Sequence, residues 1–174
     1  MGQRPNEIRS RPRLRRATVA DATEIARVQV LGWQAAYRGL VSAGVLDGLD
    51  IEEQAATWAE ILSVGDVPVF VVEDESTVVA FVQLAASGDD DIAEIVAMYV
   101  LPGHWRHGHG RRKCEKAIAE SRAGDFTAVA LWVLSGNAPA RRFYEAMGFQ
   151  TDDVTSCVDD RPGEVTRIRY VIRA

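Results

Sequence analysis

The chain has 174 residues, a formal net charge of −5 and 47% hydrophobic residues, which suits one domain with a sizeable core. The acidic balance gives no support for a nucleic-acid-binding surface, and no apolar run approaches the roughly 18 residues that would span a bilayer. The charged N-terminus lacks the apolar segment of a secretory signal, and the two cysteines, Cys114 and Cys157, are far apart. We therefore expect a cytoplasmic protein with reduced thiols that binds neither nucleic acid nor a membrane.

The composition of the first residues and the apolar periodicity predict the order of elements along the chain. Residues 1–13 are rich in arginine and proline, as is typical of a loose leader, although a basic arm could also touch nucleic acid. One folded domain is expected over residues 14–174, and Thr18 and Asp21 form a capping-box pattern at its first helix. Its predicted elements are a strand over 14–17, helices over 18–37 and 51–62, strands over 67–73, 77–86 and 92–101, a helix after Gly110, a strand over 128–134, a helix over 138–147, and strands over 149–158 and 164–173.

The most informative stretch runs from Ile92 to Ala119. Its apolar strand ends at Pro102, which has no N–H to donate to a sheet. Three glycines follow before a helix begins, and backbone N–H groups at such a turn bind phosphate with the help of the helix dipole. Positive charge is added there by Arg106, Arg111 and Arg112. The stretch therefore indicates a phosphate cradle, although a Gly-x-Gly turn alone could equally be an ordinary strand-to-helix loop.

Two known phosphate motifs are excluded at this loop. No Gly-Lys-Ser/Thr follows the glycines, so it is not a P-loop. Lys113 stands where the third glycine of a dinucleotide fingerprint would be, and an antiparallel hairpin precedes the loop. Both observations argue against a nucleotide-dependent enzyme with a Rossmann sheet.

Two segments carry a resemblance to a known family. Val-Leu-Pro102, then Trp105-Arg-His-Gly108-His-Gly110, resembles the acyl-CoA diphosphate loop of the GNAT superfamily of N-acetyltransferases. The second segment resembles the other GNAT signature more specifically, with a strand followed by Asn137, Phe143-Tyr144 and Gly148-Phe149. One departure is Trp105, where the family usually has Gln or Arg, and we expect it to alter the packing of the loop more than its capacity for phosphate.

The resemblance implies an α/β (α+β) fold: a single GNAT-like domain with a central mixed, mostly antiparallel sheet of six to seven strands, flanked by about four helices. Two parallel strands, 92–101 and 128–134, would splay apart, and the pantetheine arm of acetyl-CoA would lie in the gap like an added strand. The cofactor contacts that it implies are the main chain of Met98, Tyr99 and Val100, the loop residues Arg106, His107, Gly108, His109, Gly110 and Arg111, and the side chain of Asn137.

Catalytic roles follow from the same resemblance. Tyr144 stands where the tyrosine of the family commonly protonates the sulfur of CoA, and a phenol with a pKa of about 10 can do so; the alternative is a buried aromatic with a satisfied hydroxyl. Glu94, in an apolar strand, is either edge-exposed or a general base acting directly or through water. Trp33 and Tyr37 share a helical face and either wall the acceptor site or are core aromatics. Asn137 also fits the N-cap of a helix, a position that is compatible with cofactor binding.

All three histidines of the chain fall within six residues, at His104, His107 and His109. A metal site is conceivable. However, the loop has no cysteine close by, and a loop that faces a cofactor leaves little room for a metal cage. We therefore expect no metal here, and ring N–H groups that flank the phosphates instead.

The expected function is transfer of an acetyl group from acetyl-CoA to a primary amine of a small molecule or peptide, by direct attack in a ternary complex. The alternative is a non-catalytic acyl-CoA-binding module of GNAT fold, and the presence of both Tyr144 and Asn137 speaks against it. A homodimer is a further expectation from the resemblance. The signatures do not encode the identity of the acceptor.

Overall fold

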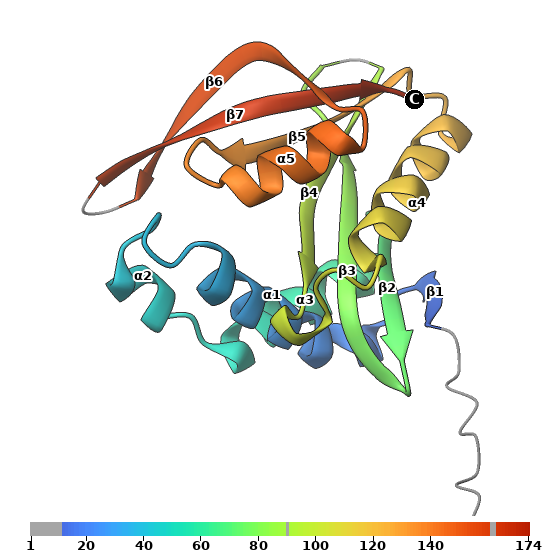
Figure 1. Ribbon diagram of the computed structural model, residues 1–174. Helices are drawn as coiled ribbons and strands as arrows, with labels where there is room; N and C mark the ends of the chain where they lie inside the picture. Colours follow the sequence, from blue (N-terminus) through green and yellow to red (C-terminus); the bar gives the residue numbers. More distant parts are fainter. Residues whose placement is uncertain (1–11, 90, 161–162) are drawn as a thin grey trace, which may run out of the picture.

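The computed structural model describes residues 12–89, 91–160 and 163–174, and seven strands form one sheet in the order β1-β2-β3-β4-β5-β7-β6 (Figure 1). The strands are β1 (Arg13–Arg16), β2 (Val69–Asp74), β3 (Thr77–Ala86), β4 (Ile92–Val100), β5 (Ala128–Leu134), β6 (Gln150–Asp160) and β7 (Gly163–Arg173). Among these strands β4 and β5 pair in parallel, and every other neighbouring pair is antiparallel. The predicted mixed, mostly antiparallel GNAT sheet is confirmed.

Five α-helices and two short 3-10 turns accompany the sheet in the described residues. They are η1 (Val19–Asp21), α1 (Ala22–Ala36), α2 (Ala43–Asp47), α3 (Ile51–Val64), η2 (Pro102–His104), α4 (His109–Ala123) and α5 (Ala138–Ala146). The helix α2 was not predicted, because five residues are too few to show an apolar repeat. No helix in the described ranges is long and apolar enough to cross a bilayer.

Both faces of the sheet are buried, each under its own helices (Figure 1). Successive side chains of a strand point to opposite faces, and β3 shows the consequence: Phe81 packs in the cluster under α1 and α3, whereas its neighbour Val82 packs in the cluster under α4 and α5. This is why β3 reads as a continuous apolar run rather than as an alternating one. Helix α1 of one layer and helix α4 of the other both contact β4, which carries part of the predicted site.

The N-terminal junction rests on the carboxylate of Asp21. Arg15 donates to both of its oxygens at 2.8 Å, and the backbone N–H of Thr18 donates to it at 2.8 Å. The same Arg15 donates through Nε to Glu73 on β2 at 2.9 Å. These bonds join β1, the start of the first helix and β2, and they confirm the predicted capping box. The leader predicted over 1–13 falls on residues of which only 12 and 13 are described, so this boundary stays a prediction.

We expect Asp21→Asn to lower the free energy of unfolding by about 1–3 kcal/mol at pH 7, because it removes charge-assisted hydrogen bonds from a group that is only 7% exposed. The hydrogen bonds from Arg15 hold the pKa of Asp21 below its ordinary value. The contribution of the carboxylate is therefore complete above the pKa of an unfolded aspartate, about 4, and is lost as the pH falls through the lower value of the folded state.

Urea unfolding of both proteins between pH 7 and pH 3 checks this prediction. The difference in the free energy of unfolding between the wild type and Asp21→Asn should become smaller as the pH falls. The exposed Asp66 offers a matched control, and Asp66→Asn should change the free energy of unfolding by less than about 0.5 kcal/mol. If the difference between the wild type and Asp21→Asn stays constant with pH, the charge of Asp21 does not contribute to the free energy of unfolding.

Candidate active site

The sheet opens between its two parallel strands. Pairing of β4 with β5 begins at Ile92–Ala128 and ends at Ile95–Leu131. Beyond that point β4 continues beside β3 as far as Val100, and β5 continues beside β7 as far as Leu134. The predicted splay is confirmed, and within the described residues no strand lies on the β5 side of the edge of β4 that contains Met98, Tyr99 and Val100.

The loop between β4 and α4 has the geometry of an anion cradle. Gly108 is the N-cap of α4 with φ +81°, and Arg106 also has a positive φ of 65°. A Cβ added at Gly108 would meet no atom within 4 Å, so there is open space beside this residue. The amides of the first turn of α4, which follows it, have no intrahelical partner. Gly110 is required for another reason, since a Cβ there would lie 3.1 Å from the ring of Phe143 on α5.

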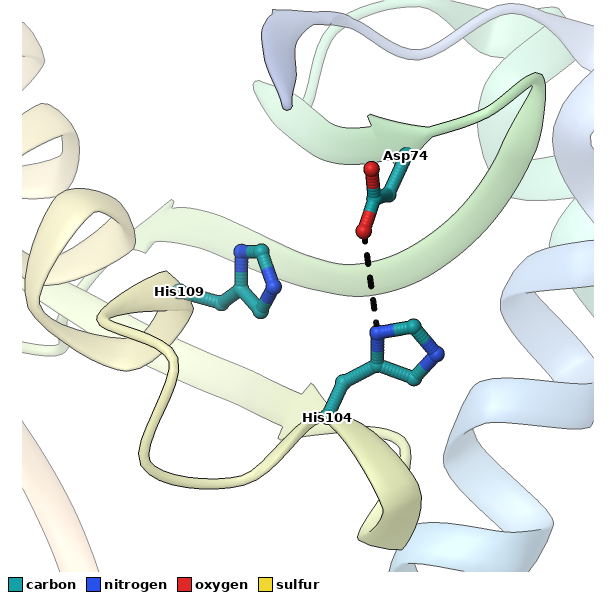
Figure 2. A group of neighbouring side chains, drawn as sticks. All are labelled: Asp74, His104 and His109. Atoms are coloured by element: carbon teal, nitrogen blue, oxygen red, sulfur yellow. Dashed lines mark ion pairs between the residues drawn. The ribbon is translucent and has the colours of Figure 1, made fainter. Parts of the chain in front are cut away.

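The charged side chains predicted for this loop are on its surface. Arg106, His107 and Arg111 are exposed, and Arg111 lies 3.8 Å from Glu115 one turn along α4. The ring of His109 is buried and turned toward Asp74 of β2, so only its main chain is available to a phosphate (Figure 2).

Trp105 and Lys113 tie the loop and α4 to the sheet. The indole Nε1 of Trp105 donates to the carbonyl of Val100 at 2.8 Å. The Nζ of Lys113 is buried and donates to the carbonyls of Tyr99 at 2.7 Å and Phe81 at 3.2 Å. Burial lowers the pKa of Lys113 to about 7. Sequence reasoning had noted Lys113 only as a missing glycine.

Helix α5 carries the two other signature residues. Asn137 is its N-cap, and its side-chain oxygen accepts from the N–H of Ala140 at 3.2 Å. Tyr144 is half-buried, with its ring edge-to-face against Phe143 and Phe149 at centroid distances of 5.1 and 5.6 Å. Its hydroxyl has no hydrogen bond to any described residue, and burial raises its pKa well above 10. The phenol therefore holds its proton at neutral pH and has a free donor.

Two further tyrosines and a thiol interact electrostatically with this phenol. The hydroxyls of Tyr37 and Tyr99 lie 3.4 Å apart, and burial raises the pKa of both. Cys114 of α4 is buried 3.7 Å from the sulfur of Met98, and burial raises its pKa to about 12. Cys114 is consequently a protonated thiol at neutral pH, which is a poor nucleophile.

A hollow of about 390 Å³ opens on the α1 side of the splayed strands. It brings together the three residues predicted for the acceptor and the base, Trp33, Tyr37 and Glu94. The rings of Trp33 and Tyr37 meet edge-to-face at 5.2 Å. Tyr144 does not line this hollow. Tyr37 and Tyr99 do line it, and both interact electrostatically with Tyr144.

Among the lining residues that sequence reasoning missed, two form a pair. Arg167 of β7 lies over the ring of Trp132 of β5, with 4.6 Å between the guanidinium carbon and the ring centroid. The Nε of Arg167 is buried without a hydrogen-bond partner in the described part of the chain. The alternation of Arg167 with apolar neighbours had indicated only a strand, because the pairing that sets β7 beside β5 cannot be read from that pattern.

Comparison with known proteins agrees with this geometry. The model of the Acetyltransferase (GNAT) family matches residues 33–149, which is more than half of the chain. The N-acetyltransferase YuaI of Bacillus subtilis (strain 168) is 28% identical over 137 residues, covering 76% of this chain and 77% of YuaI.

Solved structures share the fold. The PaiA N-acetyltransferase of Thermoplasma acidophilum, solved in complex with coenzyme A, superposes with a TM-score of 0.77 at 16% identity and covers 95% of this chain and 100% of that chain. YncA of Salmonella typhimurium, solved with its cofactor acetyl-CoA, gives 0.72 at 20% identity, with 94% of each chain covered. The chain belongs to the GNAT family of N-acetyltransferases.

Proposed function

We propose that this N-acetyltransferase moves an acetyl group from acetyl-CoA to a primary amine of a small molecule or peptide, by direct attack in a ternary complex. The observation that carries the proposal is the opening between β4 and β5, which has an amide-rich loop at one end and an aromatic hollow with one carboxylate beside it. Such an opening lets a thioester and an amine meet from opposite sides of one sheet. The coenzyme A and acetyl-CoA found with PaiA and YncA support the choice of donor.

The donor fits the groups that are available. The unpaired edge of β4 at 98–100 offers main-chain groups to the amides of pantetheine, in the manner of an added strand. The first amides of α4 and the open space over Gly108 suit a diphosphate, and Arg106, His107 and Arg111 add donors around it. Asn137 already caps α5, and its amide N–H₂ remains for the pantetheine arm.

The reaction needs one proton removed and one supplied. The amine nitrogen attacks the thioester carbonyl, the N–C bond forms and the C–S bond breaks. Glu94, directly or through water, accepts the proton that the amine must lose. Tyr144 gives its proton to the departing thiolate, since its phenol is protonated at neutral pH and its hydroxyl has no other hydrogen-bond partner among the described residues. The high pKa of the Cys114 thiol argues against an acetyl-cysteine intermediate.

The hollow favours an acceptor that carries an anionic group as well as its amine. Glu94 suits the ammonium form of the amine, and the aromatic walls suit its apolar part. Arg167 would otherwise repel a simple cation. Its buried, unpartnered Nε suits a carboxylate on the same acceptor, as in an amino acid or a peptide end.

Tyr144→Phe should lower kcat by about 100-fold or more, because the leaving thiolate loses its proton donor. The dissociation constant for acetyl-CoA should stay nearly unchanged, since the hydroxyl acts only in the reaction. Thiol release with a panel of amines gives the rate, and calorimetry gives the affinity.

Tyr170→Phe is the matched control. It removes a hydroxyl that donates to Glu145 at 2.9 Å and accepts from Arg141 at 3.0 Å, and it should cost stability with little effect on kcat. Equal losses of rate and affinity in Tyr144→Phe would make its hydroxyl structural. A wild-type protein that binds acetyl-CoA and acetylates no amine would instead be the non-catalytic binding module.

Glu94→Gln should slow the reaction most at neutral pH, where the acceptor arrives as an ammonium ion and needs a base. At alkaline pH the amine is already neutral, so the deficit should shrink. The measurement is the pH profile of kcat/KM for both proteins between pH 6 and pH 10. Parallel profiles would remove Glu94 from the proton transfer.

Arg167→Gln should raise KM about tenfold for amines that carry a carboxylate, because a charge-assisted pair is lost, and should leave KM for uncharged-tail amines nearly unchanged. Arg173→Gln changes an exposed arginine of the same strand and should affect neither class of acceptor. Equal effects of Arg167→Gln on both classes would refute the role of Arg167 in choosing the acceptor.

A further inference from the structure

Three side chains from separate segments converge beside the phosphate-binding loop. Asp74 ends β2, His104 ends η2 and His109 begins α4. Each offers one ligand atom, and these atoms all lie within 4.8 Å of one another. Figure 2 shows the Nδ1 of His104 facing Asp74, 3.9 Å from its Oδ2, while the ring of His109 points into the same gap. The arrangement is that of a set of ligands around a common point.

His109 is the second, independent observation. Its side chain is only 3% exposed, and its Nδ1 is buried with no hydrogen-bond partner among the described residues. Buried polar groups are normally satisfied, because an unpaired one costs free energy. A leucine or valine would fill a buried first-turn position of α4 at no such cost. The ring of His109 lies beside another imidazole and a carboxylate, and a cation bound by all three would give this buried imidazole a partner that the described residues do not supply.

The remaining histidine lies close to this group. The centroid of the His107 ring lies 6.3 Å from that of His104 and 6.2 Å from that of His109. The centroids of His104 and His109 are 6.0 Å apart. His107 is exposed, so a rotation of its side chain can bring it to the group without repacking the core. It can serve as a fourth ligand, or water can take that place.

The types of ligand select the ion. Two imidazoles and a carboxylate suit Zn²⁺ and related transition-metal ions, whereas Mg²⁺ and Ca²⁺ prefer oxygen ligands throughout. Bonds of about 2.0–2.2 Å in a tetrahedral site place ligand atoms about 3.3 Å apart. The 3.9 Å between His104 and Asp74 must therefore shorten by about half an ångström, and separations of up to 4.8 Å within the group by up to about 1.5 Å. Rotation of the partly exposed side chains of His104 and Asp74 supplies this movement.

We propose that Asp74, His104 and His109 form a binding site for a zinc-type divalent cation, which ties the phosphate-binding loop to the β2–β3 hairpin. The expectation that the chain binds no metal considered only the loop, where the histidines lack a partner of another type. Asp74 supplies that partner from the hairpin that precedes the loop in the chain. The ion takes no part in acetyl transfer, so the site can be tested without acetyl-CoA and independently of the proposed function.

The test uses metal-free full-length protein without a polyhistidine tag, because a tag binds zinc itself. Calorimetric titration with Zn²⁺ should show one site per chain, and Zn²⁺ should raise the Tm. Co²⁺ should give visible absorption bands typical of a tetrahedral nitrogen and oxygen site. His109→Leu and Asp74→Asn should each weaken zinc binding by about tenfold or more.

Two comparisons separate binding from folding. His109→Leu replaces a buried imidazole that has no hydrogen bond at Nδ1, so its metal-free Tm should equal or exceed that of the wild type while zinc binding is lost. Glu75→Gln alters an exposed carboxylate next to Asp74 and should leave zinc affinity unchanged. Absence of zinc binding by the wild type, or equal affinity in the wild type and His109→Leu, would overturn the proposal and leave an ordinary His104–Asp74 ion pair.

Discussion

Val96 of β4 has no partner on β3, because the register of the two strands shifts beside it: Gln83 pairs with Ala97, and the next residue, Leu84, pairs with Ile95. Such a bulge bends the strand that contains the extra residue. It comes directly after Ile95, the last residue of β4 that pairs with β5. The bulge and the opening of the sheet therefore occur at one place, and the proposed catalytic arrangement depends on that place.

The helices on both sides of this opening also pack against the sheet and form part of the core. On one side α4 presents its first turn, and the side chains that hold this turn against the sheet are unusually polar. Lys113 is satisfied by two carbonyls of β3 and β4, whereas His109 is left without a partner at Nδ1. Lys113 is a structural contact because its hydrogen bonds are made, whereas His109 is a candidate ligand because its Nδ1 has no partner among the described residues. On the other side, Trp33 of α1 and Tyr37 at its C-terminal end line the hollow that is proposed to hold the acceptor.

The parts of the molecule that could be predicted from the sequence are those encoded by contiguous residues. The ranges of β3 and β5 agree with the predicted strands, and the run from Asn137 to Phe149 indicated both α5 and the family. The parts that could not be predicted are made by strand pairing and register. Arg167 meets the hollow only because β7 pairs with β5, and Asp74 meets the histidines only through the hairpin. A one-residue bulge such as that at Val96 leaves no pattern in a continuous apolar strand.

We propose that the opening beyond Ile95 receives the pantetheine arm along the free edge of β4. Hydrogen exchange of backbone amides, followed by NMR with and without acetyl-CoA, tests it most directly. Protection should rise in the segment 97–100 and in the first turn of α4 near Gly108, and should stay unchanged in β1 and β2, far from the opening. Acetyl-CoA that binds and protects other amides, with these two segments unchanged, would contradict the account.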